Sequence, residues 1–176
     1  MKAESMYRAG REAIHNFTRD ENDALTRVGP GSLMGNLFRQ YWIPVTPAAD
    51  VQEPGGRPVR VKLLGEDLVL FRAQNGQLGL IGSFCPHRLA PLFFGRVEED
   101  GLRCPYHGWK FAPDGKCLAM PNIPAELAFT ERIHHPGYPC VERGGIIWTY
   151  MGRGGDLPLL PDLEFLRVDD DDRQYR

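Results

Sequence analysis

Two short motifs carry the residues best suited to chemistry, and each pairs a cysteine with a histidine. Cys85-Pro86-His87 is a C-x-H motif, and Cys104-Pro105-Tyr106-His107 is a C-x-x-H motif. Each offers one thiolate and one imidazole. Two such loops can hold a two-iron, two-sulfur cluster, with both cysteines on one iron and both histidines on the other. The motifs therefore predict an electron-transfer centre with Cys85, His87, Cys104 and His107 as metal ligands.

The spacing separates this prediction from a zinc site. Structural zinc sites usually group their ligands as C-x2-4-C with H-x3-5-H. Here each loop mixes a thiol with an imidazole, and both loops lie near Pro and Gly residues of the kind that shape cluster loops. A Cys2His2 zinc site is the main alternative, and chance placement of four unrelated residues is the third.

The sequence around the motifs resembles the Rieske domain of ring-hydroxylating oxygenase large subunits, and within that family the phthalate dioxygenase type. The resemblance spans roughly residues 21 to 165. One departure is Leu89, where many relatives place Gly. The segments that carry the resemblance are residues 41–45, 85–97, 101–111, 114–117 and 144–152.

The resemblance implies a Rieske-type [2Fe-2S] cofactor on Cys85, His87, Cys104 and His107. Tyr106 occupies the position at which high-potential Rieske proteins carry an extra cysteine, so the loop disulfide of those proteins is absent. A potential toward the low end of the Rieske range is then expected, with a reductase or ferredoxin as the electron donor.

The resemblance also implies what lies elsewhere. In the family, the second histidine lies at a subunit boundary of a homo-oligomer, where an Asp bridges it to the catalytic iron of a neighbouring subunit. That mononuclear iron is held by two histidines and a carboxylate in a domain that follows the Rieske domain. We identify neither the Asp nor such a ligand set in this chain. We expect the chain alone to pass one electron but not to oxygenate a substrate.

Composition sets outer limits on the function. The 176 residues suffice for one globular domain with a real core, since 42% are hydrophobic and 25% charged. A net charge of -2 provides no basic surface for nucleic acid. The sequence shows neither a membrane-length apolar run nor the apolar core of a secretory signal at its start, so a cytoplasmic location is expected.

The elements that must position the two motifs are predicted to be short strands. A helix is expected after Ser32, a possible N-cap, where apolar residues recur at helical spacing. Asn75-Gly76 predicts a hairpin just before the first motif. Without β-α-β alternation, the pattern predicts an all-β domain, a small antiparallel sandwich or barrel with a cluster-binding part. The predicted strands are 41–45, 59–63, 68–71, 78–81, 101–103, 110–111, 116–117, 132–134, 138–141 and 146–150.

Several residues receive structural rather than chemical predictions. Trp109 and Phe111 are expected to pack beneath the loops, and Cys117 and Cys140 to be ordinary buried thiols. His134 and His135 should point to opposite faces of a strand. Further predictions are helical turns at 11–17 and solvated acidic surface at 98–100 and 169–172.

The predicted organisation has three parts: an N-terminal extension at 1–26, a Rieske domain at 27–155 and, at 156–176, the start of a linker to an absent catalytic domain. Three functions remain open. They are the electron-transfer part of an aromatic-ring oxygenase, a free-standing Rieske ferredoxin, and a structural zinc module.

Overall fold

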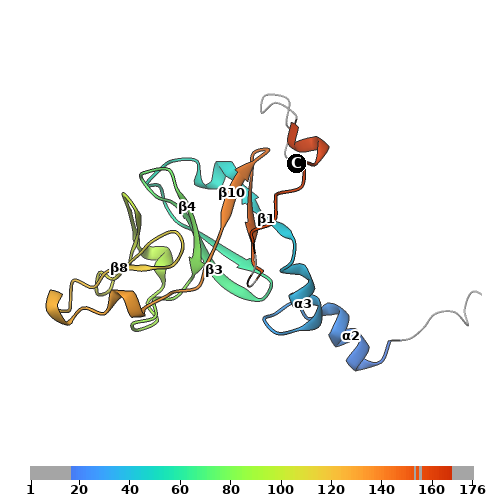
Figure 1. Cartoon of the computed structure of the whole chain (residues 1–176), viewed down its shortest axis with the longest axis horizontal. Helices are drawn as coiled ribbons and strands as arrows, with labels where there is room; N and C mark the ends of the chain where they lie inside the picture. Colours follow the sequence, from blue (N-terminus) through green and yellow to red (C-terminus); the bar gives the residue numbers. More distant parts are fainter. Residues whose placement is uncertain (1–16, 153, 155, 168–176) are drawn as a thin grey trace, which may run out of the picture.

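The chain is mainly antiparallel β-structure with two short helices, as the computed structural model shows for residues 17–152, 154 and 156–167. The α-helices are α2 (Arg19–Thr26) and α3 (Leu33–Phe38). In Figure 1 these helices lie at one end of the molecule and the β8 region lies at the other, with β3 and β4 between them. Among the described residues, no helix has the length and apolar character needed to cross a bilayer.

The strands form three open antiparallel sheets. The all-β prediction is confirmed, as open sheets and not as a closed barrel. The first sheet has the order β1-β11-β10, formed by Trp42–Pro47, Ile146–Tyr150 and Cys140–Arg143. The central sheet has the order β2-β3-β4-β9, formed by Val59–Leu63, Glu66–Arg72, Leu78–Gly82 and Gly137–Tyr138. The third, here called the distal sheet, has the order β5-β6-β7-β8, formed by Arg96–Glu98, Gly101–Arg103, Lys110–Phe111 and Cys117–Ala119. Short 3-10 helices η1 to η5 cover Ala48–Val51, Leu92–Phe94, Ala125–Leu127, Thr130–Arg132 and Glu164–Arg167.

Strand β3 of the central sheet is buried on both faces, and this organises the domain. Leu68 and Leu70 of β3 pack into a core shared with the first sheet, which includes Ile147. Val69 and Phe71, which point to the opposite face, pack into a second core shared with the distal sheet. Because both faces are covered, β3 is a continuous apolar run instead of an alternating one. The second core also contains both motif cysteines.

The predicted hairpin before the first motif is confirmed. The Ala73 N–H donates to the Gln77 carbonyl at 2.9 Å, and Gly76 has a φ of +87°, which glycine adopts without strain. Strands β3 and β4 pair from Arg72 opposite Leu78 onward, so the turn fixes the register of the strand that leads into Cys85. The predicted helix after Ser32 is also confirmed, with the Ser32 hydroxyl accepting from the Gly35 N–H.

Two strand predictions are corrected. Residues 132–134 do not form a strand, because the chain turns through η4 and only His134 bridges to Lys116. The run 138–141 is divided at Pro139, which has no N–H to donate to a ladder. Tyr138 therefore ends β9 on the central sheet, while Cys140 begins β10 on the first sheet.

Helix α2 was not predicted, although its signal is present in the sequence. Thr18 and Glu21 form a capping box, in which the Glu21 N–H donates to the Thr18 hydroxyl and the Thr18 N–H donates to the Glu21 carboxylate. The helical turns predicted at 11–17 and the acidic run at 169–172 lie outside the described residues, apart from residue 17.

Candidate metal centre

The first motif forms a six-residue loop, Cys85 to Ala90, directly after β4. The Cys85 N–H donates to the Ala90 carbonyl at 2.9 Å, and the Leu89 N–H donates to the Cys85 carbonyl at 2.8 Å. Leu89 closes the loop in the left-handed region, with a φ of +53°, and its side chain is 71% exposed. The departure from Gly noted in the sequence thus leaves a tight loop in which a leucine adopts an uncommon backbone conformation.

The second motif forms the same kind of loop, Cys104 to Trp109, between β6 and β7. The Cys104 N–H donates to the Trp109 carbonyl at 2.8 Å, and the Gly108 N–H donates to the Cys104 carbonyl at 3.2 Å. Gly108 occupies the left-handed position, with a φ of +75°. A Cβ on Gly108 would lie 2.8 Å from Cγ of Pro121, so this position requires glycine for space as well as conformation.

The two cysteines meet at the floor of the site. Cys85 is 1% exposed and Cys104 is 3% exposed, and Cys104 lies close enough to affect the pKa of the Cys85 thiol. Burial first, and then Cys104, raise the pKa of the Cys85 thiol to about 11, against hydrogen bonds from the backbone N–H groups of His87 and Arg88, which lower it. Those N–H groups favour a thiolate, and metal binding would have to release the thiol proton.

The two histidines are partly exposed and their rings lie close together. The ring centroids of His87 and His107 lie 4.6 Å apart, with 55° between the ring planes. The pKa of His107 is lowered by partial burial and then by electrostatic interactions with His87 and Arg88. A lowered pKa favours the neutral imidazole, the form that binds metals.

A charged network supports the second loop. The Glu98 carboxylate accepts hydrogen bonds from Arg103 at 2.7 and 2.8 Å, and a further Arg103 nitrogen donates to the Gly108 carbonyl at 2.7 Å. Arg103, followed by Arg96 and Lys110, holds the pKa of Glu98 at about 2. Solvated surface was predicted for 98–100. This is wrong for Glu98, whose side chain is only 19% exposed because the network covers it.

The smaller predictions near the site hold in most cases. Trp109 and Phe111 are buried beneath the loops, 4% and 0% exposed. Cys117 is buried, while Cys140 is a partly buried residue whose thiol pKa is raised to about 12 by burial. His135 is buried with its Nε2 at 2.8 Å from the Gly82 carbonyl, whereas the adjacent His134 is exposed. The two residues differ in burial, although the strand predicted to carry them does not form.

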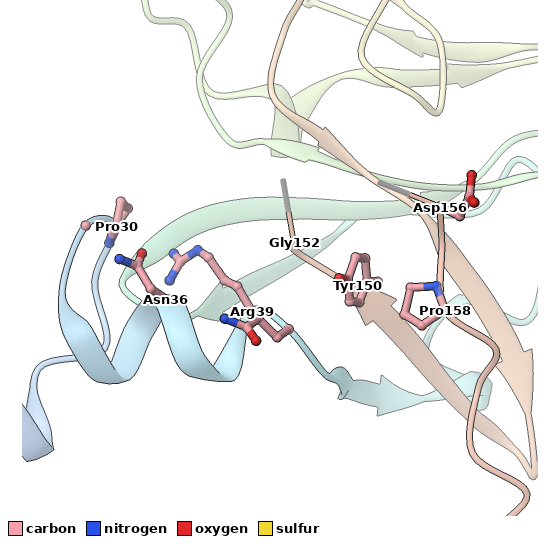
Figure 2. Close-up of a pocket in the computed structure, with 9 residues that line it drawn as sticks. Pro30, Asn36, Arg39, Tyr150, Gly152, Asp156 and Pro158 are labelled. Atoms are coloured by element: carbon pink, nitrogen blue, oxygen red, sulfur yellow. The ribbon is translucent and has the colours of Figure 1, made fainter. Parts of the chain in front are cut away.

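A cavity of about 710 Å³ lies away from the two ligand loops, between α3, the end of β11 and residues 156–158. Figure 2 shows Asn36 and Arg39 on the helix side and Tyr150 and Pro158 facing them. The Arg39 guanidinium donates hydrogen bonds to the Glu66 carboxylate, at 2.7 Å, and to three backbone carbonyls. No residue of either ligand loop lines this cavity, so it is separate from the predicted metal centre.

The predicted ligands are arranged as two pairs. In the part of the chain that the structure describes, no three His, Cys, Asp or Glu residues surround a single metal position. Instead, the Cys85 thiol lies near the Cys104 thiol, and the His87 ring lies near the His107 ring. Such pairs are the kind of donors that a binuclear centre with different ligands on each iron uses.

The comparisons with known proteins identify the family. The Rieske [2Fe-2S] domain family model matches residues 41–139, which include all four predicted ligands. The chain belongs to the Rieske [2Fe-2S] domain family. Its relatives include the oxygenase subunit of 3-chlorobenzoate-3,4-dioxygenase from Comamonas testosteroni, 50% identical over 86% of this chain. The oxygenase subunit of phthalate 4,5-dioxygenase from Pseudomonas putida is 43% identical over 81% of this chain.

Solved structures show the same Rieske fold. Apo dicamba monooxygenase superposes with a TM-score of 0.61 at 28% identity, covering 70% of this chain and 38% of that protein. NdmA of Pseudomonas putida CBB5 superposes with a TM-score of 0.56 at 33% identity, covering 64% of this chain and 34% of NdmA. The chain spans 35% of the length of the chlorobenzoate relative and 32% of the phthalate relative. This Rieske chain therefore corresponds to the Rieske part of oxygenase-like proteins and carries the [2Fe-2S] type of cofactor site.

Proposed function

We propose that Cys85 and Cys104 hold one iron of a Rieske [2Fe-2S] cluster and that His87 and His107 hold the other. The observation that carries this assignment is the separation of the donors into a buried thiol pair and a partly exposed imidazole pair. The donor set fits the group, since thiolates and imidazoles in a two-and-two division are the ligands of this cluster type.

When bound, such a cluster supplies reversible one-electron transfer. The chain's own residues determine where that transfer is accessible. Cys85 and Cys104 lie in the core, which excludes water from the thiol side. His87 and His107 lie at the solvent side, where each imidazole nitrogen not bound to iron is available to hold a proton or contact a partner.

The relatives support a proposal for the chain's place in a larger reaction. It would receive electrons from a reductase or ferredoxin and deliver them to a mononuclear non-haem iron in a catalytic domain outside this chain, within a homo-oligomeric, aromatic-ring-hydroxylating oxygenase. Support comes from the oxygenase subunits that it matches over about a third of their length. All four cysteines are free, which suits the reducing cytoplasm. The extension at 1–26, the Rieske domain at 27–155 and the linker at 156–176 remain the proposed organisation.

The test is analysis of iron and acid-labile sulfide in protein purified without oxygen, followed by an EPR spectrum after reduction with dithionite. The expected result is equal iron and sulfide and the anisotropic signal of a mixed cysteine-histidine cluster. A colourless, EPR-silent protein loaded with zinc would contradict the proposal and favour the zinc module.

A free-standing electron carrier is the second candidate, because the two-loop site alone accounts for electron transfer. The reading frame beyond codon 176 separates it from the oxygenase. A continuing frame with paired histidines and a downstream carboxylate would support the oxygenase part. A stop codon together with a stable, reducible protein would support the carrier.

A further inference from the structure

Trp109 of the second loop lies flat against His87 of the first loop. Their ring centroids are 4.6 Å apart and the ring planes differ by only 7°, so the two rings are stacked face to face. The contact crosses between loops, because Trp109 ends the loop that supplies Cys104 and His107. The orientation of one predicted ligand is thus coupled to a side chain of the other loop.

The indole ring is itself held on several sides. Its Nε1–H donates to the Asn122 side-chain oxygen at 2.7 Å, and its ring meets Phe129 edge to face at 6.1 Å between centroids. Trp109 is 4% exposed, and its carbonyl accepts from the Cys104 N–H at 2.8 Å. Because Asn122 holds its N–H and Phe129 packs against its ring, the indole presents a fixed face to His87.

His107 has a different environment. The ring contacts that the structure gives it are with His87 and with Tyr106, whose centroid is 3.7 Å away at 35°. Tyr106 is 59% exposed, so it is not held by the core as Trp109 is. The two imidazoles therefore differ in how firmly their neighbours constrain them.

A histidine ring does not fix its own plane, because rotation about its second side-chain torsion is broad. Rotation of the His87 ring would open the stack with a buried indole that has no room to follow. We propose that Trp109, held by Asn122, is a positioning residue that fixes the plane of the His87 imidazole and makes the two histidine ligands unequal. His87 is then the more firmly held ligand, and His107 the less constrained one. This inference rests on the ligand assignment proposed above.

The experiment compares the reduced, cluster-loaded protein with the Trp109→Leu, Trp109→Phe, Asn122→Ala and Tyr106→Leu variants. Pulsed EPR resolves the ¹⁴N couplings of the coordinating nitrogens. In Trp109→Leu we expect one of the two nitrogen signals to shift and broaden, with a smaller change in Asn122→Ala. Trp109→Phe, which keeps an aromatic ring at this position, should retain most of the wild-type signal. Tyr106→Leu should leave that nitrogen unchanged.

Cluster retention gives a second measurement. Residues that orient metal ligands typically change metal affinity about 10- to 100-fold, so release of iron to a chelator should be about 10-fold faster in Trp109→Leu. Phe111→Leu is the matched control, since Phe111 is equally buried in the adjoining strand but its ring packs against His135 instead of His87. It should lower stability while leaving both nitrogen signals in place.

The outcomes separate this inference from the ligand assignment. If wild-type protein lacks the mixed cysteine-histidine signal, the proposed function fails. If wild type shows the signal and Asn122→Ala and both Trp109 variants leave both nitrogen couplings unchanged, only the positioning role fails. Equal changes in the same nitrogen for Trp109→Leu and Phe111→Leu would also overturn it, because the effect would then be general loosening of the core. Should Trp109→Leu fail to fold, Asn122→Ala still decides the question, since it frees the indole N–H without removing the ring.

Discussion

The loops at 85–90 and 104–109 share one backbone design but differ in what supports them. In both, the cysteine N–H bonds to the carbonyl five residues on, and its carbonyl accepts from the fourth residue after it. In both, that fourth residue has a positive φ. The histidine is the third residue of the first loop and the fourth of the second. Identical backbones can therefore present imidazoles from different positions and still bring their rings within 4.6 Å.

The support differs because the two loops lie against different surroundings. The left-handed position of the first loop holds Leu89, whose side chain is largely in solvent. The equivalent position of the second loop lies against Pro121 and leaves no room for a Cβ. Arg103 also bonds the Gly108 carbonyl, and Glu98 holds Arg103 in place. The comparison shows that the second loop has more contacts with the rest of the protein than the first. The first loop contacts the second through the stacking of His87 on Trp109.

The largest expected effect tests what the loops have in common. Cys85→Ala and Cys104→Ala should each reduce bound iron to background, because each removes one of two buried thiolate donors. Iron analysis of anaerobically purified protein measures this. Cys140→Ala is the control and should keep its iron, as Cys140 lies on the first sheet. Full iron content in either loop variant would show that the loops do not contribute equally.

The next effect tests the crowding of the second loop. Gly108→Ala should lower the free energy of unfolding by about 2–4 kcal/mol, from the left-handed backbone and the overlap with Pro121 together. Urea unfolding of wild type and variant measures this. A loss below about 1 kcal/mol, the level of backbone conformation alone, would mean that Pro121 moves aside.

The charged support of the second loop should depend on pH. Glu98→Gln should cost about 1–2 kcal/mol at neutral pH, between the values for exposed and buried ion pairs. The folded-state pKa of Glu98, about 2, lies below its ordinary value of 4.5, so the carboxylate stabilises the fold above pH 4.5. That stabilisation is lost as pH falls from 4.5 toward 2. The difference in urea midpoint between wild type and Glu98→Gln should therefore shrink over this range. A constant difference would show that the effect is not due to charge.

The smallest effect tests whether the exposed Leu89 side chain contributes to the first loop. Leu89→Gly removes the cost of a left-handed leucine but adds entropy to the unfolded chain, so we expect a net gain of about 0.5–1 kcal/mol. Thermal unfolding of the two proteins measures it, with Leu118→Gly as a control at an exposed strand position that should instead lose stability. A destabilised Leu89→Gly would indicate that the leucine side chain contributes packing to the loop.

Much of the fold could be predicted from local signals. The Asn75-Gly76 turn and the helix after Ser32 depend on residues close in sequence, and both are confirmed. The strand predicted at 132–134 failed, since its residues meet turns that only the packed structure shows. Glu98 was misjudged because its cationic partners include Arg103 and Lys110, which come from neighbouring strands of the distal sheet.

The sequence by itself determined the kinds of donor and their spacing, because C-x-H and C-x-x-H are local patterns of residue type. It also determined the family, through those motifs and the segments around them. The motifs also predicted that the cysteines share one iron and the histidines the other. Only the tertiary structure decided that the thiols are buried and the imidazoles partly exposed. Thiols pair in the core and imidazoles pair near solvent because the distal sheet packs on the buried central sheet. The stacking of Trp109 on His87 was likewise decided there, since a contact between two separate loops depends on how the intervening strands fold.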